Sequence, residues 1–132
     1  MRRIDVTPYV AAWRERRQLE REQLTQRLQV GRKAAIRCAE FLAERYAVRR
    51  VYLFGSMLGN TLVHQRSDID LAIVGLPPEQ YVRALADIWD LLPPGFEVDL
   101  VPLEDAFPEM IERIRIEGEV LYDAQEIRRT QS

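Results

Sequence analysis

The chain has 132 residues, of which 47% are apolar and 30% charged, so it fits one folded domain and excludes a chain that is disordered throughout. A single cysteine, Cys38, excludes an internal disulfide bond. No stretch approaches the roughly 20 apolar residues that cross a bilayer. We therefore expect a cytoplasmic protein without a membrane partner. The net charge of −2 hides an asymmetry, because residues 1–50 carry 13 Arg or Lys against 6 Asp or Glu, and residues 51–132 carry 6 against 15. The two halves either serve different partners or form a solvated basic helix beside an acidic domain.

The first predicted element is a long helix that begins at Thr7–Pro8, read as an N-cap and a first helical residue, and ends near Tyr46. Small or apolar residues recur in steps of four and three, which is a helical seam: Leu24, Leu28, Gly31, Ala35, Cys38 and Leu42. Since glycine costs about 1 kcal/mol inside a helix, one long helix and two helices hinged near Gly31 both stay open. The first half has few apolar positions, so we expect this extension, residues 1–47, to project or to pack on a partner.

The next segment, residues 48–123, alternates strands with helices, and residues 124–132 form a polar tail. Apolar runs predict strands at Val51–Phe54, Ile69–Val74, Val98–Val101 and Val120–Tyr122, and helical spacing predicts helices over Pro78–Leu92 and from Pro108 to near Gly118. This alternation predicts an α/β (α+β) layer structure with helices packed on a sheet, and it leaves open whether the sheet is parallel or mixed.

Three aspartates next to buried strand positions are the candidate catalytic residues. Asp68 and Asp70 are two apart at the start of a strand, so both side chains leave the same face. Asp99 stands between apolar residues of the third strand, and neighbouring strands lie about 4.8 Å apart. We therefore expect Asp99 to lie beside the pair. Mg²⁺ prefers carboxylate oxygens, and a three-carboxylate cluster could hold two Mg²⁺ ions for an in-line phosphoryl or nucleotidyl transfer.

Gly55–Ser56 ends the first predicted strand and is the candidate phosphate-binding turn. Glycine allows close approach of the main chain to a ligand, and the serine hydroxyl adds a hydrogen-bond donor. A short helix starting at Ser56 would present free N–H groups to an anion. Alone, each motif is weak evidence; their order along the chain makes the set much more specific.

These motifs resemble the polymerase-beta-type nucleotidyltransferase superfamily, and within it most closely the minimal nucleotidyltransferases (MNT). The resemblance rests on Val51–Ser56, Ser67–Leu71 and Val98–Val101, with support from Ile114–Tyr122. It implies a polymerase-beta-like fold with a small mixed sheet, to which this chain adds a long N-terminal helix.

The resemblance also implies roles for the candidate residues. Asp68, Asp70 and Asp99 would bind Mg²⁺, and Asp99 would additionally act as the base toward the attacking hydroxyl. Gly55 and Ser56 would contact the phosphates of ATP or another NTP. Many MNT proteins are antitoxins that transfer AMP to tyrosines of a HEPN ribonuclease toxin, so the resemblance implies such a partner.

One loop departs from the family pattern. The family usually carries Ala-Arg-Gly shortly after the serine, whereas this chain reads Met57–Asn60 in a slightly longer loop. The missing arginine bears on nucleotide choice and rate more than on the metal site.

Two other functions compete with transfer onto a partner protein. The chain could be a non-catalytic antitoxin that neutralises its partner by occlusion, or a transferase for a small molecule, for which it looks too short. We expect no direct nucleic-acid binding, because the glutamates between the arginines of the N-terminal helix suggest i,i+4 ion pairs. The acceptor, the base preference and the oligomeric state stay open.

Overall fold

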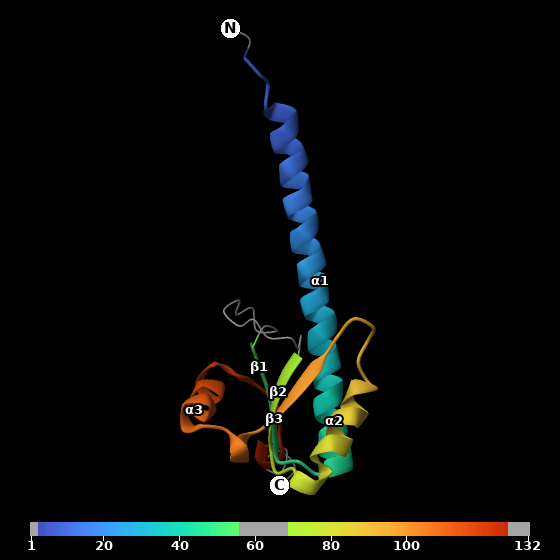
Figure 1. Cartoon of the computed structure of the whole chain (residues 1–132), viewed down its shortest axis with the longest axis vertical. Helices are drawn as coiled ribbons and strands as arrows, with labels where there is room; N and C mark the ends of the chain where they lie inside the picture. Colours follow the sequence, from blue (N-terminus) through green and yellow to red (C-terminus); the bar gives the residue numbers. More distant parts are fainter. Residues whose placement is uncertain (1–2, 56–68, 127–132) are drawn as a thin grey trace. The chain divides into compact units, whose positions relative to one another are not determined.

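The computed structural model of the chain describes residues 3–55 and 69–126 (Figure 1). Within these ranges the elements follow in the order α1 (Thr7–Tyr46), β1 (Arg50–Phe54), β2 (Ile69–Val74), η2 (Pro78–Gln80), α2 (Tyr81–Trp89), β3 (Val98–Pro102), η3 (Leu103–Asp105), α3 (Pro108–Glu117) and β4 (Glu119–Asp123). The chain divides into two compact units, Met1–Val30 and Gly31–Ser132. In the described ranges, no helix is both long enough and apolar enough to cross a membrane.

Helix α1 is one continuous helix, which decides between the two alternatives that the sequence left open. Its first helical residue is Thr7, not the Pro8 that an N-cap at Thr7 would imply, and the Thr7 N–H donates to Asp5 Oδ1 over 2.9 Å. The carboxylate satisfies one of the free N–H groups that every helix start leaves over. The buried residues of α1 are mostly small and lie at helical spacing: Gly31, Ala34, Ala35, Cys38, Ala39 and Leu42. The helix ends at Tyr46, before Ala47 in the left-handed region with φ 54°.

The four strands form a mixed sheet in the order β3-β2-β1-β4. Strand β1 pairs antiparallel with both β2 and β4, whereas β2 and β3 are parallel. The sheet is therefore mixed, as the family resemblance implies. The parallel pair matters for function, because both strands enter the sheet from the same end and carry their first residues side by side.

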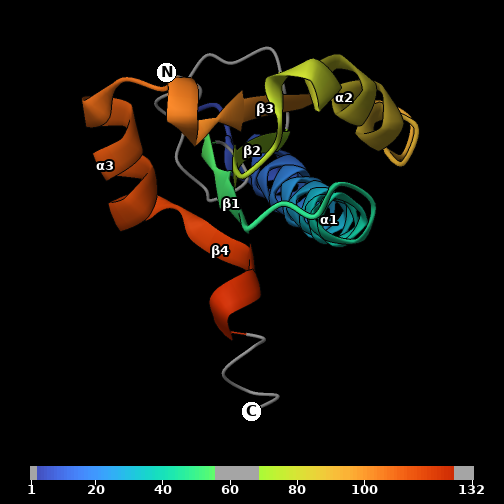
Figure 2. The same cartoon turned by 90° about the horizontal axis from the view of Figure 1, so that it is seen from below.

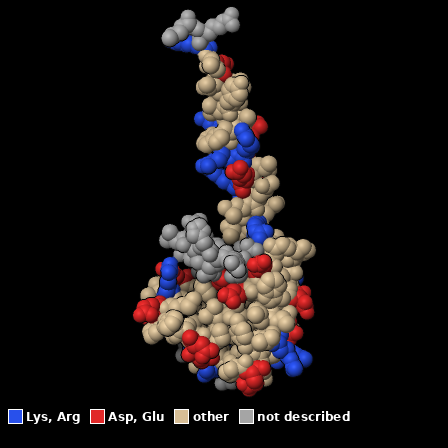
Figure 3. All heavy atoms as spheres, in the orientation of Figure 1, with Lys and Arg blue, Asp and Glu red and all other residues tan. Residues whose placement is uncertain are grey.

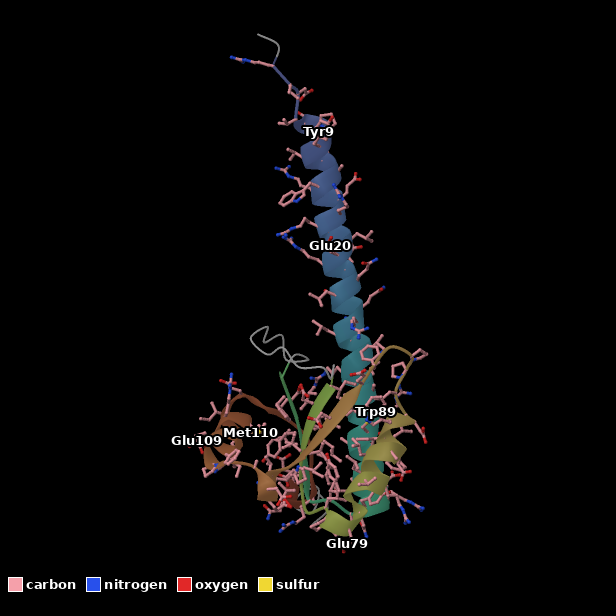
Figure 4. All side chains as sticks on the ribbon, in the orientation of Figure 1. Tyr9, Glu20, Glu79, Trp89, Glu109 and Met110 are labelled. Carbon is pink, nitrogen blue, oxygen red and sulfur yellow. The ribbon has the colours of Figure 1, made fainter. Side chains whose placement is uncertain are left out.

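Each face of the sheet carries its own apolar cluster. Figure 2 shows α3 on one face of the sheet and α2 on the other. On one face, alternate residues of β1 and β2, such as Leu53 and Leu71, pack with the Gly31–Tyr46 part of α1 and with α2. On the other face, Tyr52 and Ala72 pack with the α3 side chains. Figure 4 shows Trp89 of α2 and Met110 of α3 on opposite sides of the sheet. The sheet is thus covered by helices on both faces.

The middle helix is shorter than its sequence pattern predicts. The expected helix over Pro78–Leu92 is a 3-10 turn followed by α2, which ends at Trp89. After it, Leu91 and Leu92 donate their N–H groups three residues back, over 3.1 and 3.2 Å. Residues that precede a proline avoid the α conformation, and Pro93 follows directly, so the last predicted turn tightens and stops.

Candidate active site

Asp70 of β2 and Asp99 of β3 are partners in the parallel register. Paired positions of parallel strands carry their side chains on the same face, with the strands about 4.8 Å apart. Asp99 therefore lies beside Asp70, which is the placement that the sequence led us to expect. Both carboxylates lie on the α3 side of the sheet, because Ala72, two residues after Asp70, packs with Ile114 of α3.

The two carboxylates differ in their access to solvent. Asp70 is only 1% exposed, although it is a charged residue, whereas Asp99 is exposed. On either side of Asp99 along β3, Val98 and Leu100 point to the opposite face and are 3% and 1% exposed. The arrangement combines a buried carboxylate with one that solvent can reach.

Gly55 brings the main chain against the Asp70 carboxylate. Phe54, the last residue of β1, is paired with Asp70 in the antiparallel register, and Gly55 follows with φ +80°. A Cβ built on Gly55 would clash with Asp70 Oδ2. Glycine is needed here for two reasons, because its φ lies in the left-handed region and because no side chain fits. The end of β1 thus lies directly beside the Asp70 carboxylate.

The other two predicted site residues, Ser56 and Asp68, lie outside the described residues, as does the altered loop Met57–Asn60. Their roles as phosphate contact and metal ligand stay predictions. In residues 3–55 and 69–126, no group of three or more His, Cys, Asp or Glu side chains could hold a metal ion. Asp68, the third member of the expected cluster, lies outside these ranges.

Tyr81 is a site neighbour that the sequence analysis missed. Its hydroxyl donates to the Leu100 carbonyl over 2.6 Å, while the Leu100 N–H donates to Asp99 Oδ1 over 2.9 Å. Burial, and after it the negative charge of Asp99, raises the pKa of Tyr81. The main chain of one residue, Leu100, thus links the tyrosine to the carboxylate. The helical spacing of Tyr81 predicted only a packing role, and nothing in the sequence signals that its hydroxyl reaches β3.

The chain matches a known protein family. The sequence model described as "Polymerase beta, Nucleotidyltransferase" matches residues 37–127. The match includes β1, β2 and β3 and therefore Gly55, Asp70 and Asp99, but it leaves out the first thirty-six residues. No curated protein matches the chain.

Solved structures of toxin–antitoxin proteins share the fold. A toxin–antitoxin crystallised with AMP-PNP is 25% identical, with 69% of this chain and 75% of that chain covered and a TM-score of 0.53. The toxin–antitoxin MntA-HepT is 21% identical, with coverage of 72% and 74% and a TM-score of 0.53. A mutant, MntA-HpeT, with two aspartates changed to glutamate is 23% identical, with coverage of 66% and 70% and a TM-score of 0.52.

Proposed function

Because the chain belongs to the polymerase beta family of nucleotidyltransferases, we propose that it transfers AMP, or another NMP, from an NTP to a hydroxyl of a partner protein in a Mg²⁺-dependent reaction. The acceptor we propose is a HEPN-type ribonuclease toxin in the same cytoplasm, which the modification silences. The proposal gives Asp70 and Asp99, with Asp68, the metal-binding role, and it gives Gly55 and Ser56 the nucleotide phosphates.

The parallel register of Asp70 and Asp99 is the observation that carries this proposal. Two carboxylates side by side on one face repel each other as anions, and a divalent cation removes that repulsion. Carboxylate oxygens are the hard donors that Mg²⁺ prefers, so the donor set fits this metal. The close approach of the Gly55 main chain to Asp70 also fits, because it leaves no side chain between a phosphate and the carboxylates.

The proposed reaction uses the difference in exposure between the carboxylates. When bound, Mg²⁺ neutralises phosphate oxygens and makes the α-phosphorus easier to attack. The acceptor oxygen bonds to that phosphorus, the bond to the bridging oxygen breaks and pyrophosphate leaves. The exposed Asp99 takes the proton of the hydroxyl, while the Leu100 N–H keeps its Oδ1 in place. Ser56 and the Gly55 main chain hold the departing phosphates.

Three observations on the structural neighbours support the nucleotide and the partner. One neighbour was crystallised with AMP-PNP, an ATP-like nucleotide, and all three are toxin–antitoxin proteins. In the mutant, the two exchanged aspartates are two positions apart, which is the spacing of Asp68 and Asp70. An adenine nucleotide as donor and a toxin as acceptor are therefore the choices we propose for this chain.

A labelling experiment tests the proposal. The protein is incubated with Mg²⁺, ATP labelled at the α-phosphate and a HEPN-type ribonuclease toxin as the candidate acceptor. Wild type should label the partner, and Asp70→Asn and Asp99→Asn should each lower the rate roughly a hundredfold or more. Asp105→Asn, which removes an exposed carboxylate of η3, is the matched control and should keep the rate. Labelling that survives both site variants would contradict the proposal.

Neutralisation by occlusion is the second candidate, and one observation favours it. The family match begins at residue 37, so the whole compact unit Met1–Val30 lies outside the matched nucleotidyltransferase domain. If wild type transfers no label but still blocks the partner's toxicity, and Asp70→Asn blocks it equally well, occlusion replaces transfer as the function.

A further inference from the structure

One side of α1 within residues 3–30 carries exposed apolar and basic side chains together. They recur in steps of three and four, so they share one helix face: Val10, Trp13, Arg14, Arg17, Arg21 and Leu24. We call this set the Trp13 face. The side chains of Trp13 and Leu24 are 53% and 58% exposed, which is unusual for large apolar residues in a helix. Figure 3 shows basic side chains gathered on this part of the helix.

Within the described residues, the arginines of the Trp13 face form no ion pair that would neutralise them. Arg14, Arg17 and Arg21 make no ion pair with any residue in the described ranges, contrary to the i,i+4 pairing that the sequence suggested. The spacing sets Arg17 and Arg21 as i,i+4 neighbours of like charge, which destabilises a helix by a few tenths of a kcal/mol. By the same periodicity, Glu15 and Glu22 lie on the opposite side of α1, and Glu20 lies at the edge of the Trp13 face. With three arginines against one glutamate, the face carries a net positive charge.

The Trp13 face also has a shape that can receive a side chain. Trp13, Arg14, Arg17, Gln18 and Arg21 line a hollow of about 250 Å³. The Arg17 guanidinium lies over the Trp13 ring, with Cζ 5.1 Å from the ring centroid, so the two side chains hold each other in place. Trp and Arg are the residues most enriched among those that dominate protein–protein binding energies.

We propose that the Trp13 face docks an α-helix of another protein that carries an apolar stripe flanked by Asp and Glu. From Val10 to Leu24 the face is about 20 Å long at 1.5 Å per residue, and its three–four spacing matches the ridges of another helix. The apolar residues meet the stripe, and the three arginines meet the flanking carboxylates. The family match does not reach these residues, so docking here is separate from the chemistry at Asp70.

A second copy of the chain and an RNA fit the Trp13 face less well than an acidic helix, the first because of charge and the second because of the apolar residues. Arg17 lies at the middle of the Trp13 face. If two copies of α1 packed together through this face, in parallel or antiparallel, Arg17 of one copy would therefore lie against Arg17 of the other. An RNA partner fits the arginines and Trp13, but it offers nothing apolar for Val10 and Leu24. An acidic amphipathic helix satisfies both kinds of side chain.

Fluorescence binding of a designed probe tests the proposal. The probe is a labelled helical peptide of about 20 residues, long enough to hold a helix, with a leucine stripe flanked by glutamates. Its twin has lysine at each glutamate position. The full-length protein carries Trp89→Phe, so that of its two tryptophans only Trp13 reports. The acidic peptide should bind and shift the Trp13 emission, the lysine twin should not, and binding should weaken with added salt.

Matched charge reversals locate the binding site. Arg17→Glu should weaken binding roughly tenfold or more, whereas Arg16→Glu, with the same change of charge off the Trp13 face, should change it less than twofold. Asp70→Asn should bind the acidic peptide like wild type, so the binding result can be interpreted even if the proposed transfer reaction fails. Circular dichroism checks that each variant keeps its helix.

Four outcomes would overturn the proposal. The first is no binding of the acidic peptide, and the second is equal loss in Arg17→Glu and Arg16→Glu. The third is tighter binding of a single-stranded RNA than of the peptide, lost in Arg17→Glu. The fourth is a dimer in light scattering that Arg17→Glu dissociates, which would assign the Trp13 face to a second copy of the chain.

Discussion

The Gly55 main chain lies so close to the Asp70 carboxylate that a Cβ on Gly55 would overlap Asp70 Oδ2. The contact follows from the antiparallel register, which pairs Phe54 with Asp70 and leaves Gly55 as the next residue. A buried carboxylate is thus enclosed by main chain on one side and by the neighbouring strand on the other. The fold therefore requires glycine at position 55, in addition to the phosphate contact that we propose for it.

Gly55→Ala should lower the free energy of unfolding by about 2–4 kcal/mol. Part of the loss, about 1–2 kcal/mol, comes from a side chain at positive φ, and the remainder comes from displacing the Asp70 carboxylate. Urea denaturation followed by circular dichroism measures the sum.

Gly95→Ala is the matched control that separates the two contributions. Gly95 has φ +85°, close to that of Gly55, but a Cβ there would meet no heavy atom within 4 Å. It should therefore show the backbone contribution alone. Equal losses in the two variants would mean that the space beside Asp70 is not restricted as described.

Nucleotide and metal together should stabilise the protein through Asp70. With Mg²⁺ and AMP-PNP at about one hundred times the dissociation constant, binding adds about 2.7 kcal/mol and raises the melting temperature. Removing the metal with EDTA should abolish the shift, and so should Asp70→Asn, because a carboxylate ligand is lost. Differential scanning fluorimetry measures this without any acceptor. An undiminished shift in Asp70→Asn would remove this residue from the proposed metal site.

The sequence was sufficient to predict the strands and the placement of Asp99. Apolar runs mark the strands, because buried strands need apolar residues. Gly55 and Gly75 directly follow β1 and β2, and Pro102 is the last residue of β3. The alternation of Val98, Asp99 and Leu100 then fixes which face the carboxylate takes. The metal and phosphate roles themselves stay predictions.

Features that depend on tertiary contacts could not be predicted in the same way. The hydrogen bond from Tyr81 to β3 joins residues nineteen positions apart, and local periodicity carries no information on such a contact.

The expected arginine–glutamate pairs of α1 failed for a different reason. Such pairs are sterically allowed at i,i+4, but long side chains lose entropy when they pair at an exposed site. The first half of α1 is exposed, so the entropy cost of pairing outweighs the gain from an ion pair there.

Tyr81→Phe should cost about 0.5–1.5 kcal/mol of stability, because it removes one hydrogen bond to the Leu100 carbonyl. If Leu100 also positions Asp99, as its N–H bond to Oδ1 suggests, kcat for nucleotidyl transfer should fall severalfold while KM for ATP stays unchanged. Steady-state kinetics on the labelled partner gives both constants. A rise in KM with unchanged kcat would instead assign Tyr81 to nucleotide binding.

Alkaline pH should destabilise the fold through Tyr46. Burial raises the pKa of Tyr46, and the hydrogen bond that its hydroxyl donates to Asp87 Oδ2 over 2.5 Å adds to the rise. The folded state therefore holds this proton more tightly than the unfolded state, whose tyrosines titrate near pH 10. The contribution of Tyr46 to stability is fully present below the unfolded pKa and is lost as pH rises through the folded pKa.

Urea titrations from pH 8 to pH 11 test this. Tyr46→Phe should be less stable than wild type at pH 8, and the difference in stability should shrink above about pH 10. Asp87→Asn keeps an acceptor for the hydroxyl without the charge, so its stability should fall less steeply with pH. A constant difference between Tyr46→Phe and wild type across this range would contradict the raised pKa.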